Sequence, residues 1–163
     1  MKLKPQATVI FSILFIIAGI LGSWALGWWQ TESDKTPQLL EVAGETGEAT
    51  AYDPADIKGS YTLGEISTLF EIPLTDLAGA FNIEAGGAEA FKVKELETIY
   101  TDKDSEVGTS SMRLFVAWYK ALPFLRKEES FLPAPAVNIL LEKAALTPEQ
   151  EEYLASHTYT APQ

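Results

Sequence analysis

Two stretches of the chain share one pattern of apolar and polar positions. Residues 61–70 read YTLGEISTLF and residues 91–100 read FKVKELETIY, an offset of thirty residues. Both stretches begin and end with an aromatic residue, and a glutamate and a threonine recur at matching positions. The apolar residues within each stretch recur mostly at intervals of three, which places them along one side of a helix. A match at a fixed offset predicts one helical unit that is used twice.

Each stretch is followed by a second amphipathic helix, so we expect repeat units over 61–83 and 91–122. In the first unit, Thr62 and Glu65 match a capping box, in which each side chain accepts a hydrogen bond from the other residue's amide. Pro73 then separates the first helix from the second. Two short helices joined by a tight turn resemble a helix-turn-helix.

The second unit is expected to be longer than the first. Its first helix is predicted over 93–100, and its second helix after Gly108, with Thr109 or Ser110 as the cap. The apolar residues of the two second helices match at an offset of 38, so the second unit holds eight extra residues around 101–108. Its second helix is apolar on more than one face and should lie at the centre of the domain.

A helical C-terminal pair completes the expected fold. Apolar residues over 133–157 recur at helical spacing, and the last helix is predicted to start with Thr147 as its cap and Pro148 at its first position. Residues 159–163 are expected to fray. The sequence thus predicts an all-α domain over 59–158, built from a diverged helix-turn-helix-like repeat.

Residues 1–29 have a different character. Two lysines precede an uncharged run over 7–29, whose twenty-three residues would span about 34 Å as a helix. Such a run predicts a single helix in the lipid bilayer of the cytoplasmic membrane, with the N-terminus inside and the domain outside. A cleaved signal peptide is the alternative, because Ser23 and Ala25 have the small side chains that cleavage requires. The length of the run favours a retained anchor.

Small residues recur every fourth position within this predicted helix, at Gly19, Ser23 and Gly27. Small side chains allow a second membrane helix to approach closely. Glycine is also common in membrane helices in general. The stripe is therefore a candidate contact with another membrane protein subunit or with a second copy of the chain.

Residues 30–58 contain seven acidic residues, two lysines and few apolar groups. A segment of this composition has little surface to bury, so the sequence predicts an acidic, flexible tether between anchor and domain.

Charge restricts the partners of the domain. Ten basic and 23 acidic residues lie beyond residue 30, a net charge of 10 − 23 = −13. Such a surface repels phosphate backbones. The helix predicted over 73–81 also contains no Arg, Lys, Asn or Gln with which to read DNA bases. We therefore expect no nucleic-acid partner.

The inventory of reactive side chains is small. The chain contains no cysteine, which excludes disulfides, thiolate metal sites, cysteine nucleophiles and ligation of iron–sulfur clusters by this chain. His157 is its one histidine, so sites with several histidine ligands are excluded as well. We expect no catalytic residues and no bound cofactor.

Acidic residues gather at Asp102, Asp104 and Glu106, in the predicted insertion. Read as an EF-hand loop they supply the first three carboxylate positions, but Val107 stands where the loop needs glycine and Arg113 where it needs glutamate. A solvated loop is the simpler interpretation. A looser calcium site that shares Asp53 or Asp56 stays open as an alternative.

Three aromatic residues, Trp118, Tyr119 and Phe124, lie near the end of the long predicted helix. Aromatic residues at helical spacing usually complete a core. They could instead line a groove between the repeat units that binds a peptide or another subunit.

The segments 57–66 (IKGSYTLGEI) and 70–74 (FEIPL), together with Leu77, resemble small membrane-anchored proteins and C-terminal domains associated with bacterial membrane iron–sulfur electron-transfer proteins. These families supply no catalytic residues to transfer to this sequence. The resemblance implies an accessory role beside a redox complex.

The sequence therefore predicts a membrane-anchored, extracytoplasmic accessory or interaction protein. An enzyme that uses carboxylates in a cleft between the repeat units is an alternative from another class. A calcium-dependent scaffold is a third interpretation.

Overall fold

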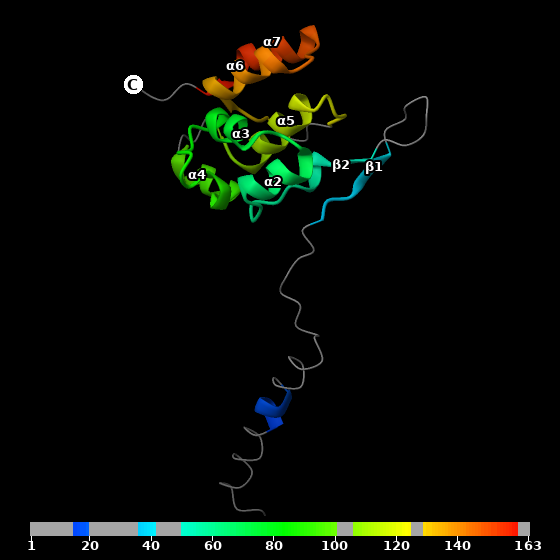
Figure 1. Cartoon of the computed structure of the whole chain (residues 1–163), viewed down its shortest axis with the longest axis vertical. Helices are drawn as coiled ribbons and strands as arrows, with labels where there is room; N and C mark the ends of the chain where they lie inside the picture. Colours follow the sequence, from blue (N-terminus) through cyan, green and yellow to red (C-terminus); the bar gives the residue numbers. More distant parts are fainter. Residues whose placement is uncertain (1–14, 20–35, 42–49, 101–105, 125–128, 160–163) are drawn as a thin grey trace, which may run out of the picture. The chain divides into compact units, whose positions relative to one another are not determined.

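The computed structural model describes residues 15–19, 36–41, 50–100, 106–124 and 129–159 (Figure 1). The chain divides into two units, Met1–Lys35 and Thr36–Gln163, and we describe each by itself.

Residues 15–19 of the first unit are helical and exposed. A side-chain carbon added at Gly19 would have no neighbour within 4 Å. No helix among the described residues is both apolar and long enough to cross a bilayer. The rest of the predicted span, with Ser23 and Gly27, lies outside the described residues.

The second unit is a small, mostly helical domain with a few short strands, so the prediction of an all-α domain was wrong in that detail. Short 3-10 helices are labelled η. In chain order the elements are β1 (Leu39–Glu41), β2 (Thr50–Tyr52), η1 (Pro54–Asp56), α2 (Leu63–Phe70), α3 (Leu74–Ala80), η2 (Ala88–Ala90), η3 (Val93–Glu95), α4 (Leu96–Ile99), α5 (Thr109–Tyr119), β3 (Leu132–Pro133), α6 (Ala134–Lys143), α7 (Pro148–Ser156) and β4 (Thr158–Tyr159). Helices α6 and α7 lie on one side of α3 and α5, with α2 and α4 on the other (Figure 1).

The first helical pair matches the sequence prediction closely. Helix α2 begins after Thr62, whose hydroxyl accepts from the amide of Glu65 at 3.2 Å. The Glu65 carboxylate accepts in return from the Thr62 amide at 2.8 Å, so the capping box is confirmed. The helix ends at Glu71, which takes a left-handed conformation with φ 52°. That conformation turns the chain before Pro73, after which α3 begins.

The second helical pair begins at the predicted residues but departs from the prediction in the type of its first helix and in the cap of its second. The predicted helix over 93–100 is a 3-10 turn, η3, that leads into the four-residue α4. Its cap position is occupied by Lys92, which makes no capping hydrogen bond. Helix α5 begins after Gly108, whose amide donates to the Ser111 hydroxyl at 3.2 Å, so Thr109 and Ser110 are not the cap.

The two repeated stretches are hydrogen-bonded to each other at matching positions. Thr62 and Lys92, thirty residues apart, form an antiparallel bridge. The amide of Leu63 donates to the Phe91 carbonyl at 3.0 Å, and the amide of Val93 donates to the Tyr61 carbonyl at 2.9 Å. Leu63 corresponds to Val93 at the offset of thirty, and Tyr61 corresponds to Phe91. The two hydrogen bonds are therefore equivalent in the repeat.

Glycines on either side of this bridge allow the two backbones to approach. A Cβ at Gly64 would lie 2.9 Å from the Glu89 carbonyl oxygen, and a Cβ at Gly59 would lie 3.0 Å from the Lys94 Cβ. Positions 59 and 89 correspond at the offset of thirty, as do 64 and 94. Gly64 lies against Glu89, and Gly59 lies against Lys94, so the two contacts occupy equivalent places in the repeat.

Substituting Lys92 with threonine should stabilise the domain by about 0.5–1 kcal/mol relative to Lys92→Ala. Lys92 already has an extended cap conformation, φ −89° and ψ 139°, close to that of Thr62 at −92° and 160°. The Glu95 amide donates to the carbonyl of residue 92 at 2.9 Å, so the new hydroxyl should share it, as the Thr147 hydroxyl shares the Gln150 amide with the Thr147 carbonyl. Urea unfolding of both variants measures the difference, and equal stability would contradict the proposed equivalence of the two helix starts.

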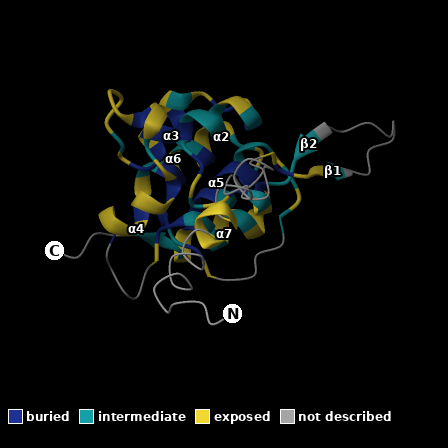
Figure 2. Cartoon of the chain, turned by 90° about the horizontal axis from the view of Figure 1, so that it is seen from below, coloured by how far each residue is buried: buried dark blue, intermediate teal, exposed yellow. Residues whose placement is uncertain are grey.

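Helix α5 is the central helix, as the sequence predicted. Most of its side chains are buried, and the ring of Phe115 lies 5.7 Å from the ring of Phe81, the residue after α3, in an edge-to-face contact. Buried residues concentrate where α3, α5 and α6 face one another (Figure 2).

The C-terminal pair also begins as predicted. Thr147 and Gln150 form a second capping box at the start of α7, with Pro148 at its first position. The predicted fraying from residue 159 was wrong for Tyr159, because β4 pairs with β3 in parallel and joins Tyr159 to Pro133. The ring of Tyr159 also lies 5.1 Å from that of Tyr100.

The predicted flexible tether over 30–58 was wrong for much of its described part. Strands β1 and β2 form an antiparallel hairpin, with Leu39 paired to Tyr52, that projects from the helical body (Figures 1 and 2). Pro37 and Pro54 are buried, and Ile57 is fully buried. The average composition of the segment is polar, but a few apolar residues at its ends are enough to fix it to the core.

Candidate functional site

The three aromatic residues proposed for a groove lie in different environments. Trp118 is 5% exposed, belongs to the core and makes an edge-to-face contact with Tyr153 at 5.6 Å. Tyr119 and Phe124 are half-buried and pack against the core. The structure therefore favours the core interpretation for Trp118, whereas a partner contact by the other two stays a prediction.

The hydroxyl of Tyr119 leads to a cluster of polar side chains that joins three helices. It donates to Asp76 Oδ2 at 2.6 Å, from α5 to α3. Lys143, in the last turn of α6, places its ammonium 2.8 Å from both carboxylate oxygens of Asp76. Asp76 is 8% exposed, whereas the Lys143 side chain is 42% exposed. The cluster thus fixes α3, α5 and α6 to one another at the edge of the core.

The cluster keeps Asp76 ionised and Tyr119 protonated. Burial by itself would raise the pKa of Asp76, but the hydrogen bonds from Lys143 and Tyr119 and the positive charge of Lys143 lower the pKa below its ordinary value. Burial, the hydrogen bond to Asp76 and the negative charge of Asp76 raise the pKa of Tyr119 to about 12. At neutral pH neither group is ready to exchange a proton.

This arrangement suits a structural role better than catalysis. A general acid needs a carboxyl group whose pKa is raised towards neutral pH, and the pKa of Asp76 is lowered. Both oxygens of Asp76 already accept hydrogen bonds within the cluster. Sequence reasoning missed the cluster, because Asp76 lies 43 residues from Tyr119 and 67 from Lys143. The one available signal was an aspartate in a short, otherwise apolar helix.

His157 caps the end of α7 and is part of an aromatic stack. Its ring lies 3.8 Å from that of Tyr153 and parallel to it, and 5.2 Å from that of Phe131. Its Nδ1 is 2.9 Å from the Ser156 hydroxyl, which also bonds to the carbonyl of Tyr153 at 3.0 Å. The serine and the histidine thus complete the helix end.

The calcium candidates are only partly described. Asp102 and Asp104 lie outside the described residues, and Glu106 is exposed. Asp53 and Asp56, the acidic residues considered for a looser site, accept backbone hydrogen bonds from Ala55 and Gln38. No group of three potential metal-ligating side chains occurs within the described part of the chain.

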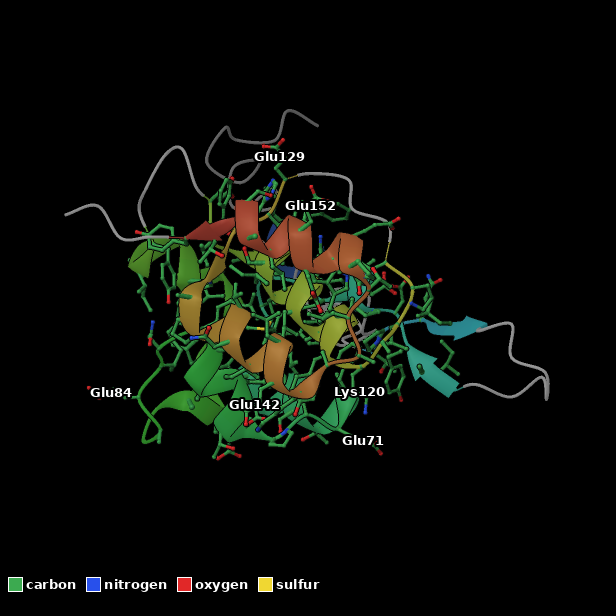
Figure 3. All side chains as sticks on the ribbon, turned by 90° about the horizontal axis from the view of Figure 1, so that it is seen from above. Glu71, Glu84, Lys120, Glu129, Glu142 and Glu152 are labelled. Atoms are coloured by element: carbon green, nitrogen blue, oxygen red, sulfur yellow. The ribbon has the colours of Figure 1, made fainter. Side chains whose placement is uncertain are left out.

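The surface of the domain is acidic. Glu84, Glu129 and Glu152 come from three separate segments and point outwards (Figure 3). In α7 the acidic residues Glu149 and Glu151 lie in the first turn, where they complement the positive end of the helix dipole. These carboxylates are dispersed, which is typical of a solvated surface.

Comparison with protein-family models, curated proteins and solved structures finds no match.

The resemblance to domains of iron–sulfur electron-transfer proteins consequently depends on residues 57–66, 70–74 and Leu77 of this chain. Most of these residues build the fold. Ile57, Tyr61, Leu63, Ile66, Phe70, Ile72 and Leu77 are buried. Gly59 and Gly64 flank the bridge between the two repeated stretches. The residues that carry the resemblance therefore contribute to the architecture of this domain.

Proposed function

We propose that this chain is a membrane-anchored, non-catalytic accessory subunit that acts outside the cytoplasmic membrane beside another membrane protein. The observation that carries the proposal is the uncharged run over 7–29, next to a small helical domain with an acidic surface. The domain supplies a surface and the run supplies an anchor. By its resemblance, the partner is a membrane complex concerned with electron transfer.

In this proposal the domain is a diverged repeat of a helix-turn-helix-like unit. The reciprocal hydrogen bonds at Leu63 and Val93 support a repeat, because they join positions that correspond at the offset of thirty. The insertion around 101–108 and the loss of the cap at Lys92 distinguish the second unit from the first.

The charged cluster supports a non-catalytic role. Asp76, Tyr119 and Lys143 satisfy one another and hold three helices together. Glu65, the recurring glutamate of the first stretch, is used in a capping box. These are structural uses of the residues on which an enzyme would have to draw.

Affinity purification in mild detergent, from membranes of the source organism, tests this function. The full-length chain should co-purify with one membrane complex in stoichiometric yield. A matched chain, in which an unrelated membrane helix replaces residues 1–29, distinguishes contacts of the helix from contacts of the domain. The double variant Gly19→Leu, Gly27→Leu should reduce the yield at least about tenfold if the small-residue stripe packs on the partner. Recovery of both chains without any partner would contradict the proposal.

A further inference from the structure

We infer that the outer edge of strand β1 binds an extended, basic segment of a partner protein, which adds a third strand to the hairpin. The binding surface consists of the outward backbone groups of Leu39 and Glu41 together with the side chain of Leu39. This inference rests on the proposed function, since it names the surface through which the accessory domain would hold its partner. It does not depend on residues 1–29.

The hydrogen bonds of the hairpin leave one edge of β1 open. The amide of Asp53 donates to the Gln38 carbonyl at 2.8 Å, so these two residues form a hydrogen-bonded pair of the ladder. In an antiparallel ladder such pairs alternate with pairs whose backbone groups point away from the neighbouring strand. Leu39 and Glu41 therefore direct their amides and carbonyls outwards, away from β2.

Among the described residues, no segment pairs with this outer edge. The sheet contains β1 and β2 alone. Strand β2 contacts α2, where the ring of Tyr52 lies 6.4 Å from that of Phe70. The hairpin projects from the helical body (Figures 1 and 2). Unpaired backbone groups on such an edge can pair with an extended segment of another protein.

The side chain of Leu39 adds an apolar contact to this edge, since 59% of it is exposed. Leu39 is paired with Tyr52, so the two side chains lie on the same face of the hairpin and continue a row that begins at Phe70. A β-branched or aromatic residue of an incoming strand would extend this row. Pro37 has no amide hydrogen and is buried, so the new ladder would begin at Leu39.

Charge favours a basic partner over a second copy of the chain. Residues 36–58, which include the hairpin, contain five acidic residues and one lysine, a net charge of 1 − 5 = −4. Two copies paired through β1 would bring two such segments together, and like charges repel. An incoming strand with lysines at alternate positions would instead complement this charge, while its apolar residues face Leu39.

Peptide titration of the isotope-labelled full-length chain, in maltoside micelles, tests the site. The probe is the synthetic peptide Lys-Val-Lys-Val-Lys-Val-Lys, which places lysines on one face of a strand and valines on the other. NMR measures its affinity and identifies the amides that become protected from hydrogen exchange. Bound peptide should slow exchange of the Leu39 and Glu41 amides at least about tenfold and leave the Leu40 amide, which faces β2, unchanged.

Two further peptides separate main-chain pairing from charge. The lysine peptide with a methyl group on every amide nitrogen keeps its charge but cannot donate to the ladder. Glu-Val-Glu-Val-Glu-Val-Glu keeps its amides and reverses the charge. Each should bind at least about tenfold more weakly than the lysine peptide. Equal affinity of the methylated peptide would overturn strand pairing, and equal affinity of the acidic peptide would overturn the basic partner.

A matched pair of variants tests the edge from the side of the protein. Leu39→Pro removes the outward amide and no hydrogen bond of the hairpin, so it should lower peptide affinity about tenfold. Leu39→Ala keeps the amide and should lower affinity less, about two- to threefold. Slow exchange of the Asp53 amide verifies that the hairpin is intact. If the proline opens the hairpin, the protected amides of the original chain decide the question by themselves.

Three results would overturn the inference. They are full peptide affinity in an intact Leu39→Pro, protection of other amides in place of Leu39 and Glu41, and the absence of binding at millimolar peptide. Sedimentation in micelles should give the same mass for the original chain and Leu39→Pro. A dimer that the proline abolishes would assign the edge to a second copy and so overturn the basic partner.

Co-purification from native membranes distinguishes failure of the inference from failure of the proposed function. Leu39→Pro should lose the membrane complex that the original chain retains. Retention of the complex by Leu39→Pro would overturn the inference and leave the proposed function standing. Recovery of the original chain without a partner would overturn the proposed function, while the peptide titration still decides whether the edge binds a basic strand.

Discussion

Replacing Gly64 with alanine should destabilise the domain by about 2–3 kcal/mol, since the new methyl group has no room. Its Cβ would lie 2.8 Å from the Glu89 Cγ and 2.9 Å from the Glu89 carbonyl oxygen. A side chain can move aside, but the carbonyl belongs to the backbone that runs into the bridge between Thr62 and Lys92. The substitution should therefore force the two repeated stretches apart.

A matched glycine in the next helix provides the control for this prediction. A Cβ at Gly79 would meet only Ile139 Cδ1, at an ordinary contact distance of 3.7 Å. Gly79→Ala should be neutral or should stabilise by about 0.5 kcal/mol, because alanine favours the helix. Urea unfolding followed by circular dichroism measures both variants. If Gly64→Ala were as stable as Gly79→Ala, the close approach would not be a constraint on this fold.

Replacing Asp76 with asparagine should cost about 2–3 kcal/mol at pH 7, the second large effect. The amide nitrogen cannot accept a hydrogen bond from the Lys143 ammonium, and if it faces Tyr119 that hydroxyl must turn from donating to accepting. In either orientation the negative charge that pairs with Lys143 is lost. Tyr119→Phe removes one hydrogen bond and leaves the ion pair, so it should cost less, about 1–2 kcal/mol. Chemical unfolding of both variants and of the double variant measures how strongly the two sites are coupled.

The effect of Asp76→Asn should depend on pH with a known sign. The pKa of Asp76 is lowered in the folded state, so its contribution is fully present above the pKa of the unfolded chain, about 4. That contribution is lost as the pH falls through the lower folded pKa. The difference between the original chain and Asp76→Asn should therefore shrink below about pH 4.

At high pH the change in the stability of the domain depends on the ionisation of Tyr119. Its folded pKa of about 12 lies above the ordinary value of 10.0, so its stabilising contribution should be lost as the pH rises from one value to the other. Tyr119→Phe should remove this loss. The free energy of unfolding of the original chain should thus depend on pH differently from that of Asp76→Asn at low pH and from that of Tyr119→Phe at high pH. Identical pH dependence in all three chains would contradict the role given to the cluster.

The sequence by itself determined the helices that have local signals at their ends. Thr62 with Glu65, and Thr147 with Gln150, are capping pairs whose partners lie three residues apart, so each pair can be recognised without knowledge of the fold. The central position of α5 followed in the same way from apolar side chains on more than one of its faces. Where the local signal was absent, at Lys92, the sequence predicted one helix over 93–100, and the chain instead forms the 3-10 helix η3 followed by the four-residue α4.

Only the tertiary structure decided which distant residues meet. The ion pair of Asp76 with Lys143 spans 67 residues, and the bond from Arg113 to Ile57 spans 56. No spacing in the sequence predicts such pairs, because they form only after the helices have packed. The segment over 36–58 shows the same limit: its polar composition predicted a tether, but three buried residues, Pro37, Pro54 and Ile57, attach it to the core. Average composition describes how much surface a segment can bury, whereas the fold decides whether the few apolar side chains that it has find a place in the core.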